Sequence, residues 1–449
     1  MISRLSTYRI PSWGVIAVGL LLCVTTASAG QVMGGASSTS VDADMLAANC
    51  RNAAEYSRRL GGKSMLVILR GQMLCEDYAA GAGPERSYRL ASGTKSFWGV
   101  LALAAVDDGL FELDDPVSAT ITEWRNDPNK SRIKVRQLLD FTSGLDPATD
   151  TLQGRPGQSD KFAAVLGIRG KDAPGHSFAY GPSHLFAFGV YLQRKLAAAG
   201  KNPDPLRYLE SRILEPIGLE IGSWQKDGAG NPIMPAGAHV TAREWAKFGQ
   251  LIDNGGLWQG RQIISPGLMR QLSEGSQANP AYGLTFWLNR GSPSSQSADI
   301  VDANATDRHR RKSDQGFIYS AGPRDLIMAA GQGKQRLYII PSLHLVVVRQ
   351  GEGGKGWRDS EFLASLLEGT TPKAAGSRDP PAAVAASDWR SACADDMQRF
   401  CPDSGVGARA LRQCFAAHRD QISQSCKEAV RSMRAARGHS DGEQPFPGD

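Results

Sequence analysis

Strand-forming sequence lies at both ends of a long central region, and this distribution constrains the fold more than any other feature. Five short apolar runs read as strands, at residues 64–70, 73–75, 326–330, 335–340 and 343–348. Helices are expected at residues 41–60 and 360–367, and the region between the two groups of strands looks predominantly helical with long loops. We therefore expect an α+β fold, in which an antiparallel sheet built from both chain ends is flanked by helices and a helical subdomain.

A serine and a lysine stand three residues apart at the start of the first strongly apolar helix. Ser92 and Lys95 precede an apolar run that ends near Gly109, so one helical turn places the hydroxyl beside the amine. The helix start favours an oxyanion, and a lysine in dry surroundings is neutral enough to accept a serine proton. A second Ser-x-x-Lys, beginning at Ser131, lies in a polar loop. Taken alone, Ser92 can equally be an ordinary N-cap and Lys95 a solvated residue.

A tyrosine in a glycine-rich loop is a candidate for a second acid or base. Tyr180 lies within residues 175–183, just before an apolar helix expected from Leu185 to Leu196. Beside two cations, a tyrosine loses its proton well below its ordinary pKa of about 10. The alternative is a loop aromatic that only packs.

The order of these motifs resembles the serine β-lactamase and penicillin-binding superfamily. Most similar is the branch of class C β-lactamases, D-alanyl-D-alanine carboxypeptidases, related esterases and 6-aminohexanoate-dimer hydrolases. The resemblance covers residues 41–367 and implies a β-lactamase-like fold. Besides Ser-x-x-Lys, Phe-x-Tyr and a Gly-rich approach to a terminal hairpin, the matching segments are residues 138–145, 215–219, 248–256, 282–287 and 341–348.

The resemblance implies a role for each matching residue. Ser92 is the acylated nucleophile, Lys95 its activating partner and Tyr180 the general base, while the backbone N–H groups of Ser92 and Gln335 form the oxyanion hole. Neither a metal nor a cofactor is implied. The implied substrate-binding positions are Ser183, Gln332, Gly333 and Lys334.

Two positions depart from the family's pattern. Pro182 stands where the family usually has Asn or Ser, and it offers no side-chain donor, so neighbouring Ser183 is the nearest substitute. Lys334 replaces a glycine on a strand that normally lies flat against substrate. Because both positions help to hold a lactam and its carboxylate, we expect inefficient β-lactam turnover.

These observations predict an exported serine hydrolase that cleaves a small amide or ester through a Ser92 acyl-enzyme. Two alternatives stay open. One is a D-alanyl-D-alanine carboxypeptidase or β-lactamase, and the other is a catalytically lapsed binding protein. A Ser-His-Asp hydrolase is disfavoured, because residues 175–179 resemble a nucleophile elbow but end in alanine, and no strand leads into them. The histidines show no metal-ligand spacing.

The N-terminal segment has the pattern of a signal peptide. Residues 1–29 carry two arginines, an apolar run and Ala27-Ser28-Ala29, which is an A-x-A cleavage site. Cleavage near Ala29 predicts a periplasmic or secreted protein, and no later stretch approaches membrane-spanning length. Removing two of the 51 basic residues and no acidic residue lowers the formal charge from +6 to +4. This mild balance argues for neither nucleic acid nor a membrane as a partner, and we expect no nucleic acid partner and no membrane span.

Six cysteines follow the signal peptide, an even number that favours disulfides in an oxidising compartment. Cys50 and Cys75 are placed to link the first helix to the second strand. The other four cysteines lie within residues 388–437. We expect this segment to form a small all-α domain that is stabilised by disulfides. A linker is expected at residues 368–387 and a disordered tail at residues 438–449.

The spacing of these four cysteines resembles the cysteine-rich repeat of Golgi apparatus protein 1, as seen in Cys393-Ala394-Asp395-Asp396 and Phe400-Cys401. Nested pairing, Cys393 with Cys426 and Cys401 with Cys414, suits a folded-back hairpin, although four cysteines allow three connectivities. Zinc is disfavoured because no C-x-x-C pair is present. A protein or cell-envelope component is the expected kind of partner for this segment.

Overall fold

The computed structural model describes residues 42–152, 159–292, 316–353 and 356–370, together with residues 393, 396, 399–401, 417–418, 420–424 and 426–427. The chain divides into two compact units, Met1–Thr371 and Pro372–Asp449. The expected signal peptide and C-terminal tail lie outside the described residues, as does all but the first part of the expected linker. Those boundaries therefore stay predictions.

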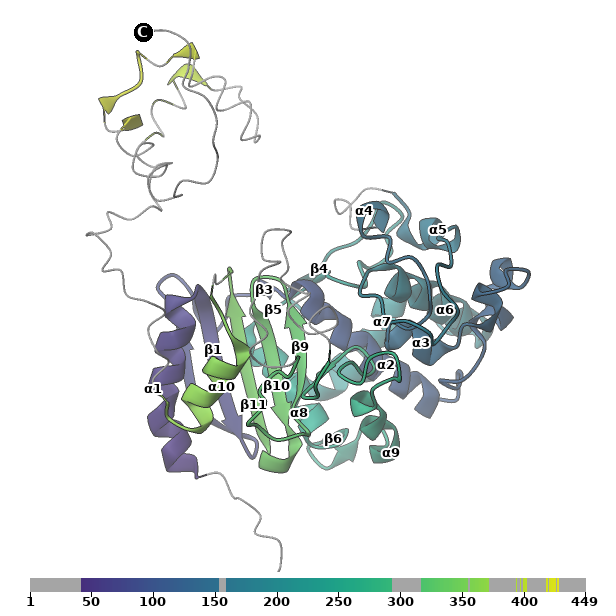
Figure 1. Cartoon of the computed structure of the whole chain (residues 1–449), viewed down its shortest axis with the longest axis horizontal. Helices are drawn as coiled ribbons and strands as arrows, with labels where there is room; N and C mark the ends of the chain where they lie inside the picture. The colour runs from purple at the N-terminus through teal and green to yellow at the C-terminus, as the bar shows by residue number, and fades with distance from the viewer. Residues whose placement is uncertain are drawn as a thin grey trace, which may run out of the picture. The chain divides into compact units, whose positions relative to one another are not determined.

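A six-stranded antiparallel sheet forms the centre of the first unit (Figure 1), with strand order β2-β1-β11-β10-β9-β8. The strands are β1 (Gly62–Leu69), β2 (Gln72–Tyr78), β8 (Trp287–Leu288), β9 (Ile327–Gly331), β10 (Gln335–Ile340) and β11 (Leu345–Gly351). β1 pairs with β11 in a register that sets Val67 opposite Val347. Strands from the N-terminal and C-terminal parts of the first unit therefore pair inside the sheet, which confirms the expected α+β architecture.

Helices cover both faces of the sheet. α1 (Ala43–Arg59) packs against α10 (Asp359–Leu367) and contacts β1 and β2, whereas α8 (Ala242–Asp253) contacts β1, β10 and β11. On β10, Leu337 lies towards α8, and the next residue, Tyr338, stacks on Phe362 of α10 at a centroid distance of 5.7 Å. Alternate side chains thus fill two separate layers. Each large apolar side chain buried in this way contributes about 1.5–3 kcal/mol.

A helical region continues from the sheet edge and is gathered on one side in Figure 1. Its helices are α2 (Lys95–Asp107), α3 (Val135–Leu139), α4 (Thr149–Leu152), α5 (Lys161–Leu166), α6 (Ser183–Ala198), α7 (Pro205–Leu209) and α9 (Pro266–Met269). The sequence did not reveal the short strands in this region, which are β3 (Tyr88–Arg89), β4 (Ser223–Trp224), β5 (Ala238–Val240), β6 (Leu257–Trp258) and β7 (Arg261–Gln262). Strands of two or three residues are too short to show a period.

The structure forms the predicted disulfide between Cys50 of α1 and Cys75 of β2. In the second unit Cys393 is bonded to Cys426, with an S–S distance of 1.96 Å. Cys401 is also disulfide-bonded, and its expected partner Cys414 lies outside the described residues. The all-α fold of this unit and its resemblance to the Golgi protein repeat stay predictions.

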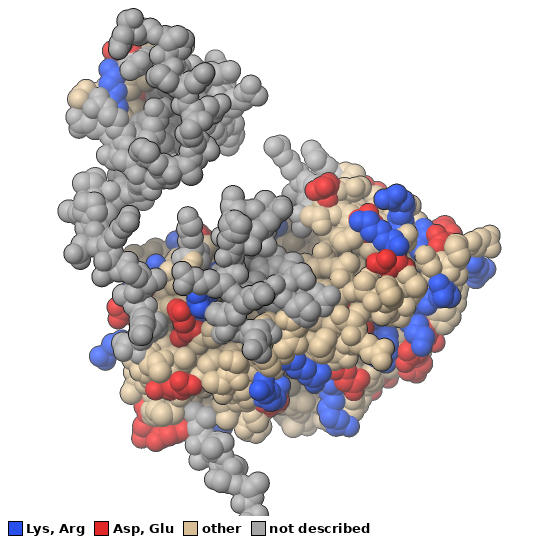
Figure 2. Space-filling model, viewed as in Figure 1, with Lys and Arg blue, Asp and Glu red and all other residues tan. Residues whose placement is uncertain are grey.

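On the face shown in Figure 2, basic and acidic side chains are interspersed. Surface ion pairs of the first unit include Arg194 with Glu123 at 2.7 Å and Arg136 with Asp114 at 3.1 Å. Over the described ranges, every helix is too short or too polar to cross a bilayer.

Candidate active site

Ser92 lies in a 3₁₀ turn, η1 (Ala91–Thr94), and the α-helix that follows begins only at Lys95. The sequence had placed Ser92 in the helix itself. Side chains three residues apart eclipse one another in a 3₁₀ turn, so the expected pairing survives. Lys95 Nζ lies 2.8 Å from Ser92 Oγ. Ala91, at φ 47°, takes the left-handed conformation where the chain leaves β3.

Lys95 is almost completely removed from solvent, with 5% of its surface exposed. Burial, with a smaller contribution from the positive charge of Arg89, lowers the pKa of Lys95 to about 7. A large fraction of the amine is therefore neutral at neutral pH, as a proton acceptor for a serine must be.

Three consecutive carbonyl groups, those of residues 234–236, hold this region in place. They accept hydrogen bonds from Trp98 Nε1, Lys95 Nζ and Arg89 Nε, at 2.5, 3.0 and 3.4 Å respectively. No motif in the sequence indicated this segment. A carbonyl group contributes nothing to a side-chain motif, and the contacts span about 140 residues.

Tyr180 reaches the same site from the loop before α6. Lys95 Nζ lies 5.0 Å from the centroid of the Tyr180 ring. Trp287 stacks on that ring at 5.5 Å, while Phe141 and Tyr282 lie at 5.4 and 6.2 Å. The structure thus brings the phenol to the Ser92–Lys95 pair and surrounds it with an aromatic cluster that fixes its orientation.

The buried side chain of His184 links the tyrosine loop to the core through two hydrogen bonds. Its Nδ1 lies 2.8 Å from Ser143 Oγ, and its Nε2 lies 2.7 Å from the carbonyl oxygen of Ala179. His184 is fully buried, and burial is the main reason that its pKa falls to about 4. The ring is therefore neutral, so Nε2–H donates to Ala179 and Nδ1 accepts from Ser143. His184 holds the residue next to Tyr180, a role that its place in the sequence did not indicate.

The hairpin of β9 and β10 contacts η1 directly. At Gly331, an added Cβ would lie 1.9 Å from the carbonyl oxygen of Leu90 and 2.8 Å from the backbone nitrogen of Gly93. Only glycine allows this approach. The contact places the start of β10, and with it Gln335, beside the turn that carries Ser92.

The four expected substrate-binding residues lie in different environments. Gln332 is exposed and Gly333 is half-buried, whereas Lys334 is 5% exposed. Ser183 is fully buried, and its Oγ has no hydrogen-bond partner among the described residues. Of the four, Gln332 and Gly333 therefore offer surface to a substrate.

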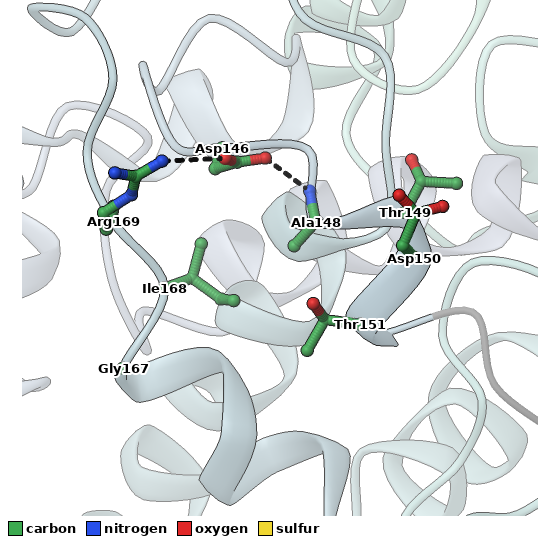
Figure 3. Close-up of a pocket in the computed structure, with 8 residues that line it drawn as sticks. All are labelled: Asp146, Ala148, Thr149, Asp150, Thr151, Gly167, Ile168 and Arg169. Atoms are coloured by element: carbon green, nitrogen blue, oxygen red, sulfur yellow. Dashed lines mark hydrogen bonds and ion pairs between the residues drawn. The ribbon is translucent and has the colours of Figure 1, made fainter.

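A polar cavity of about 320 Å³ is lined by residues 146, 148–151 and 167–169 (Figure 3). Asp146 accepts the N–H of Ala148 at 3.0 Å and pairs with Arg169 at 3.9 Å. Pro147, between these lining residues, packs so closely on Gly181 that a Cβ there would lie 2.4 Å away. Over the described residues, no group of three or more His, Cys, Asp or Glu side chains is placed to hold a metal.

Two curated proteins are similar to part of this chain. Protein flp of Staphylococcus aureus (strain MRSA252) is 26% identical over 180 residues, which cover 37% of this chain and 35% of flp. The 6-aminohexanoate-dimer hydrolase of Paenarthrobacter ureafaciens is 24% identical over 258 residues, 50% of this chain and 61% of the hydrolase. The chain thus spans about a third of the length of flp and about three fifths of the hydrolase.

Among solved structures, EstCE1, a hydrolase with promiscuous acyltransferase activity, has a TM-score of 0.55 at 14% identity, over 73% of this chain and 99% of EstCE1. At that identity the likeness is one of fold. The model of the Beta-lactamase family matches residues 45–348. This match covers the central sheet and both Ser92 and Tyr180, and the chain therefore belongs to the Beta-lactamase family.

Proposed function

We propose that this protein is a serine hydrolase that cleaves a small amide or ester through a covalent Ser92 acyl-enzyme. The observation that carries the proposal is the 2.8 Å contact between Ser92 Oγ and the buried amine of Lys95. The similarity to the 6-aminohexanoate-dimer hydrolase supports the reaction class.

In the acylation step, Ser92 Oγ forms a bond to the substrate carbonyl carbon while neutral Lys95 takes the serine proton. The carbonyl oxygen becomes an oxyanion, stabilised by the N–H groups of Ser92 and Gln335. Loss of one such donor usually costs about 2.7–4 kcal/mol of barrier. The bond to the leaving amine or alcohol then breaks, and that group departs with a proton relayed through the Tyr180 hydroxyl.

Hydrolysis of the acyl-enzyme reverses these roles. As the water oxygen attacks the ester carbonyl, the Tyr180 hydroxyl takes a proton from the water and passes its own proton to neutral Lys95. The bond from the acyl carbon to Ser92 Oγ then breaks, and Lys95 returns the proton to the serine oxygen. The aromatic cluster around Tyr180 favours this step, because it keeps the phenol close to the lysine.

Linear amides and esters are proposed in preference to β-lactams. Pro182 has no side-chain donor, and the Ser183 hydroxyl is fully buried. The Lys334 side chain is also buried, so its amine is not displayed to a substrate carboxylate. Specific recognition of a lactam carboxylate would need polar groups that face the site.

A fluorophosphonate probe tests the nucleophile. We expect the wild type to be labelled and Ser92→Ala to take no label. Ser131→Ala is the matched control, since Ser131 heads the other Ser-x-x-Lys and lies in a polar 3₁₀ turn; it should be labelled like the wild type. Folded wild type that takes no label would overturn the proposal and favour a binding protein. Competition by esters, linear amides, D-alanyl peptides and β-lactams then ranks the substrate classes.

We further propose that the protein is exported to the periplasm or secreted. The Cys50–Cys75 disulfide supports an oxidising compartment. N-terminal sequencing of the purified protein is expected to begin at Gly30, and an intact Met1 in the extracytoplasmic fraction would contradict cleavage. A protein or cell-envelope partner for residues 388–437 stays a prediction.

A further inference from the structure

The turn between β9 and β10 is held from the side of the sheet that faces α10. Two arginines on the paired strands, Arg336 and Arg349, have no exposed surface. Arg336 Nη1 donates to the carbonyl oxygens of Gly331 and Gln335, at 3.2 and 3.0 Å. These two residues are the last of β9 and the first of β10.

Arg349 holds the rest of the turn. Its Nη1 donates to the carbonyl oxygens of Gly333 and Lys334, at 2.9 and 2.8 Å. Its Nη2 donates to the carbonyl oxygen of Leu60, 2.9 Å away at the end of α1. Together the two guanidinium groups bind four of the five carbonyls from residue 331 to residue 335. A planar guanidinium can hold two acceptors in a fixed geometry, which an amine cannot.

This turn needs such support because its backbone is strained. Gly333 and Lys334 have φ values of 85° and 63°, so two successive residues are left-handed. For a residue with a Cβ, such as Lys334, that conformation is unfavourable because the Cβ comes too close to the following carbonyl oxygen. The side chain of Gln335 is also tied down, since it donates to the carbonyl oxygen of Gly351 and accepts the N–H of the same residue. Gln335 is thereby held twice, through its carbonyl oxygen by Arg336 and through its side chain by Gly351.

Asp359, at the start of α10, balances the positive charge behind the turn. Arg336 Nε donates to Asp359 Oδ1 at 2.7 Å, and the Tyr338 hydroxyl and Trp357 Nε1 donate to the same oxygen. Burial alone would raise the pKa of Asp359, but the charges of Arg336 and then Lys334 hold it well below its usual range.

We propose that Arg349 and Arg336, balanced by Asp359, are positioning residues that set the orientation of the Gln335 N–H in the oxyanion hole. The inference rests on the proposed function. The carbonyls of the turn are occupied by the guanidinium groups, and the hairpin is pressed on η1 at Gly331. The amide of Gln335 is consequently preorganised before a substrate arrives, and small shifts of such a donor reduce the rate strongly.

Arg349→Lys is the main test, because lysine keeps the positive charge but lacks the planar guanidinium group that binds several carbonyl oxygens at once. Val347→Ala is the matched control: Val347 lies on the same strand and face, is fully buried, and makes no bond to the turn through its side chain. For each protein, fluorophosphonate labelling run to completion counts the active sites, and kcat per labelled site, KM and melting temperature are then measured with an ester substrate.

We expect Arg349→Lys to lower kcat per labelled site by about 10²-fold, with KM changed by less than about threefold, because the oxyanion exists only in the transition state. Val347→Ala should lower the melting temperature but leave kcat per labelled site unchanged. A merely structural role for Arg349 would reduce the number of labelled sites instead.

Labelled Arg349→Lys with wild-type kcat per site overturns the inference and leaves the proposed function standing. Wild type without label at Ser92 overturns the proposed function itself. If Arg349→Lys does not fold, Asp359→Asn and Asp359→Glu take its place. The first is expected to lower kcat per site and the second to restore part of it, and equal kcat values in both and in the wild type would count against the inference.

Discussion

Lys95 Nζ lies between Ser92 Oγ, at 2.8 Å, and the carbonyl oxygen of Pro235, at 3.0 Å. The Ser92 hydroxyl is the proposed reacting group, whereas the Pro235 carbonyl oxygen is a backbone atom and is held in place by the fold. The amine can therefore release or accept a proton without moving, provided that it is neutral when Ser92 attacks. Since burial lowers its pKa to about 7, the protonation state of this one group should govern acylation near neutral pH.

The rate of acylation should rise with pH through about 7. Below that value Lys95 is protonated and has no lone pair for the serine proton, and above it the amine is a base. Measurement of kcat/KM from about pH 5 to pH 9 with a neutral ester would show the rise. A profile that is flat across pH 7 would contradict Lys95 as the acceptor.

Arg89→Gln should move this midpoint to higher pH. The charge of Arg89 is the second cause of the lowered Lys95 pKa, after burial, so its removal makes the protonated lysine less unfavourable. Arg86→Gln is the control, because Arg86 is exposed and bonds the carbonyl oxygen of Gly81. Its profile should match that of the wild type. The same midpoint in both variants would exclude a direct influence of Arg89.

Tyr180→Phe should lower kcat by about 10²- to 10⁴-fold, the usual contribution of a general acid or base. The phenylalanine ring keeps the stacking on Trp287, so the loop should stay in place. Tyr282→Phe, in the same cluster, removes a buried hydroxyl and should change kcat by a few-fold at most. Equal losses in the two variants, measured with one ester, would point to packing alone.

Gly331→Ala should separate the hairpin from the nucleophile turn. The new Cβ would overlap the carbonyl oxygen of Leu90, so β9 or η1 must shift, at a cost of about 1–3 kcal/mol in folding stability. We also expect kcat per labelled site to fall. Gly83→Ala, with no atom within 4 Å of its Cβ, should leave both quantities at wild-type values. A fully active Gly331→Ala would show that the contact is dispensable.

His184 should make folding stability depend on pH on the acid side. Its pKa is about 4 in the folded protein and about 6.5 in an unfolded chain, so between these values the unfolded chain binds the extra proton. This contribution is complete above pH 6.5 and is lost as the pH falls towards 4. Asp140, whose pKa burial raises to about 6, acts in the opposite direction.

Urea denaturation tests this dependence. The free energy of unfolding should fall more steeply with decreasing pH in the wild type than in His184→Gln, whose side chain cannot be protonated. Because Asp140 is present in both proteins, its effect cancels from the difference. Identical slopes would mean that His184 does not stay neutral in the fold.

The structural features that were predicted correctly are those that depend on local spacing or on a characteristic side chain. Ser92 and Lys95 lie within one turn, so their contact follows from spacing whether that turn is α or 3₁₀. Strands β9 to β11 were found from apolar runs, and the Cys50–Cys75 disulfide from the position of two thiols on adjacent elements. Each of these signals is carried by a short stretch of chain.

The parts that were missed depend on backbone atoms and on distant contacts. Pro235 reaches Lys95 across 140 residues through a carbonyl group that every residue possesses. His184 looked like any buried histidine until its bonds to Ser143 and Ala179 were seen. Arg349 reads as a charge at the end of a strand, yet its guanidinium is fully buried beneath the turn at Gly333.

The amino-acid sequence by itself determined the α+β sheet formed from both chain ends, the Ser92–Lys95 pair and the candidacy of Tyr180. Periodicity and short-range spacing encode such features directly. Only the tertiary structure decided that Lys95 is shielded from water, that its amine lies over the Tyr180 ring and that Lys334 is buried. Burial and long-range hydrogen bonding depend on which distant segments pack together, and no local stretch of sequence specifies that packing.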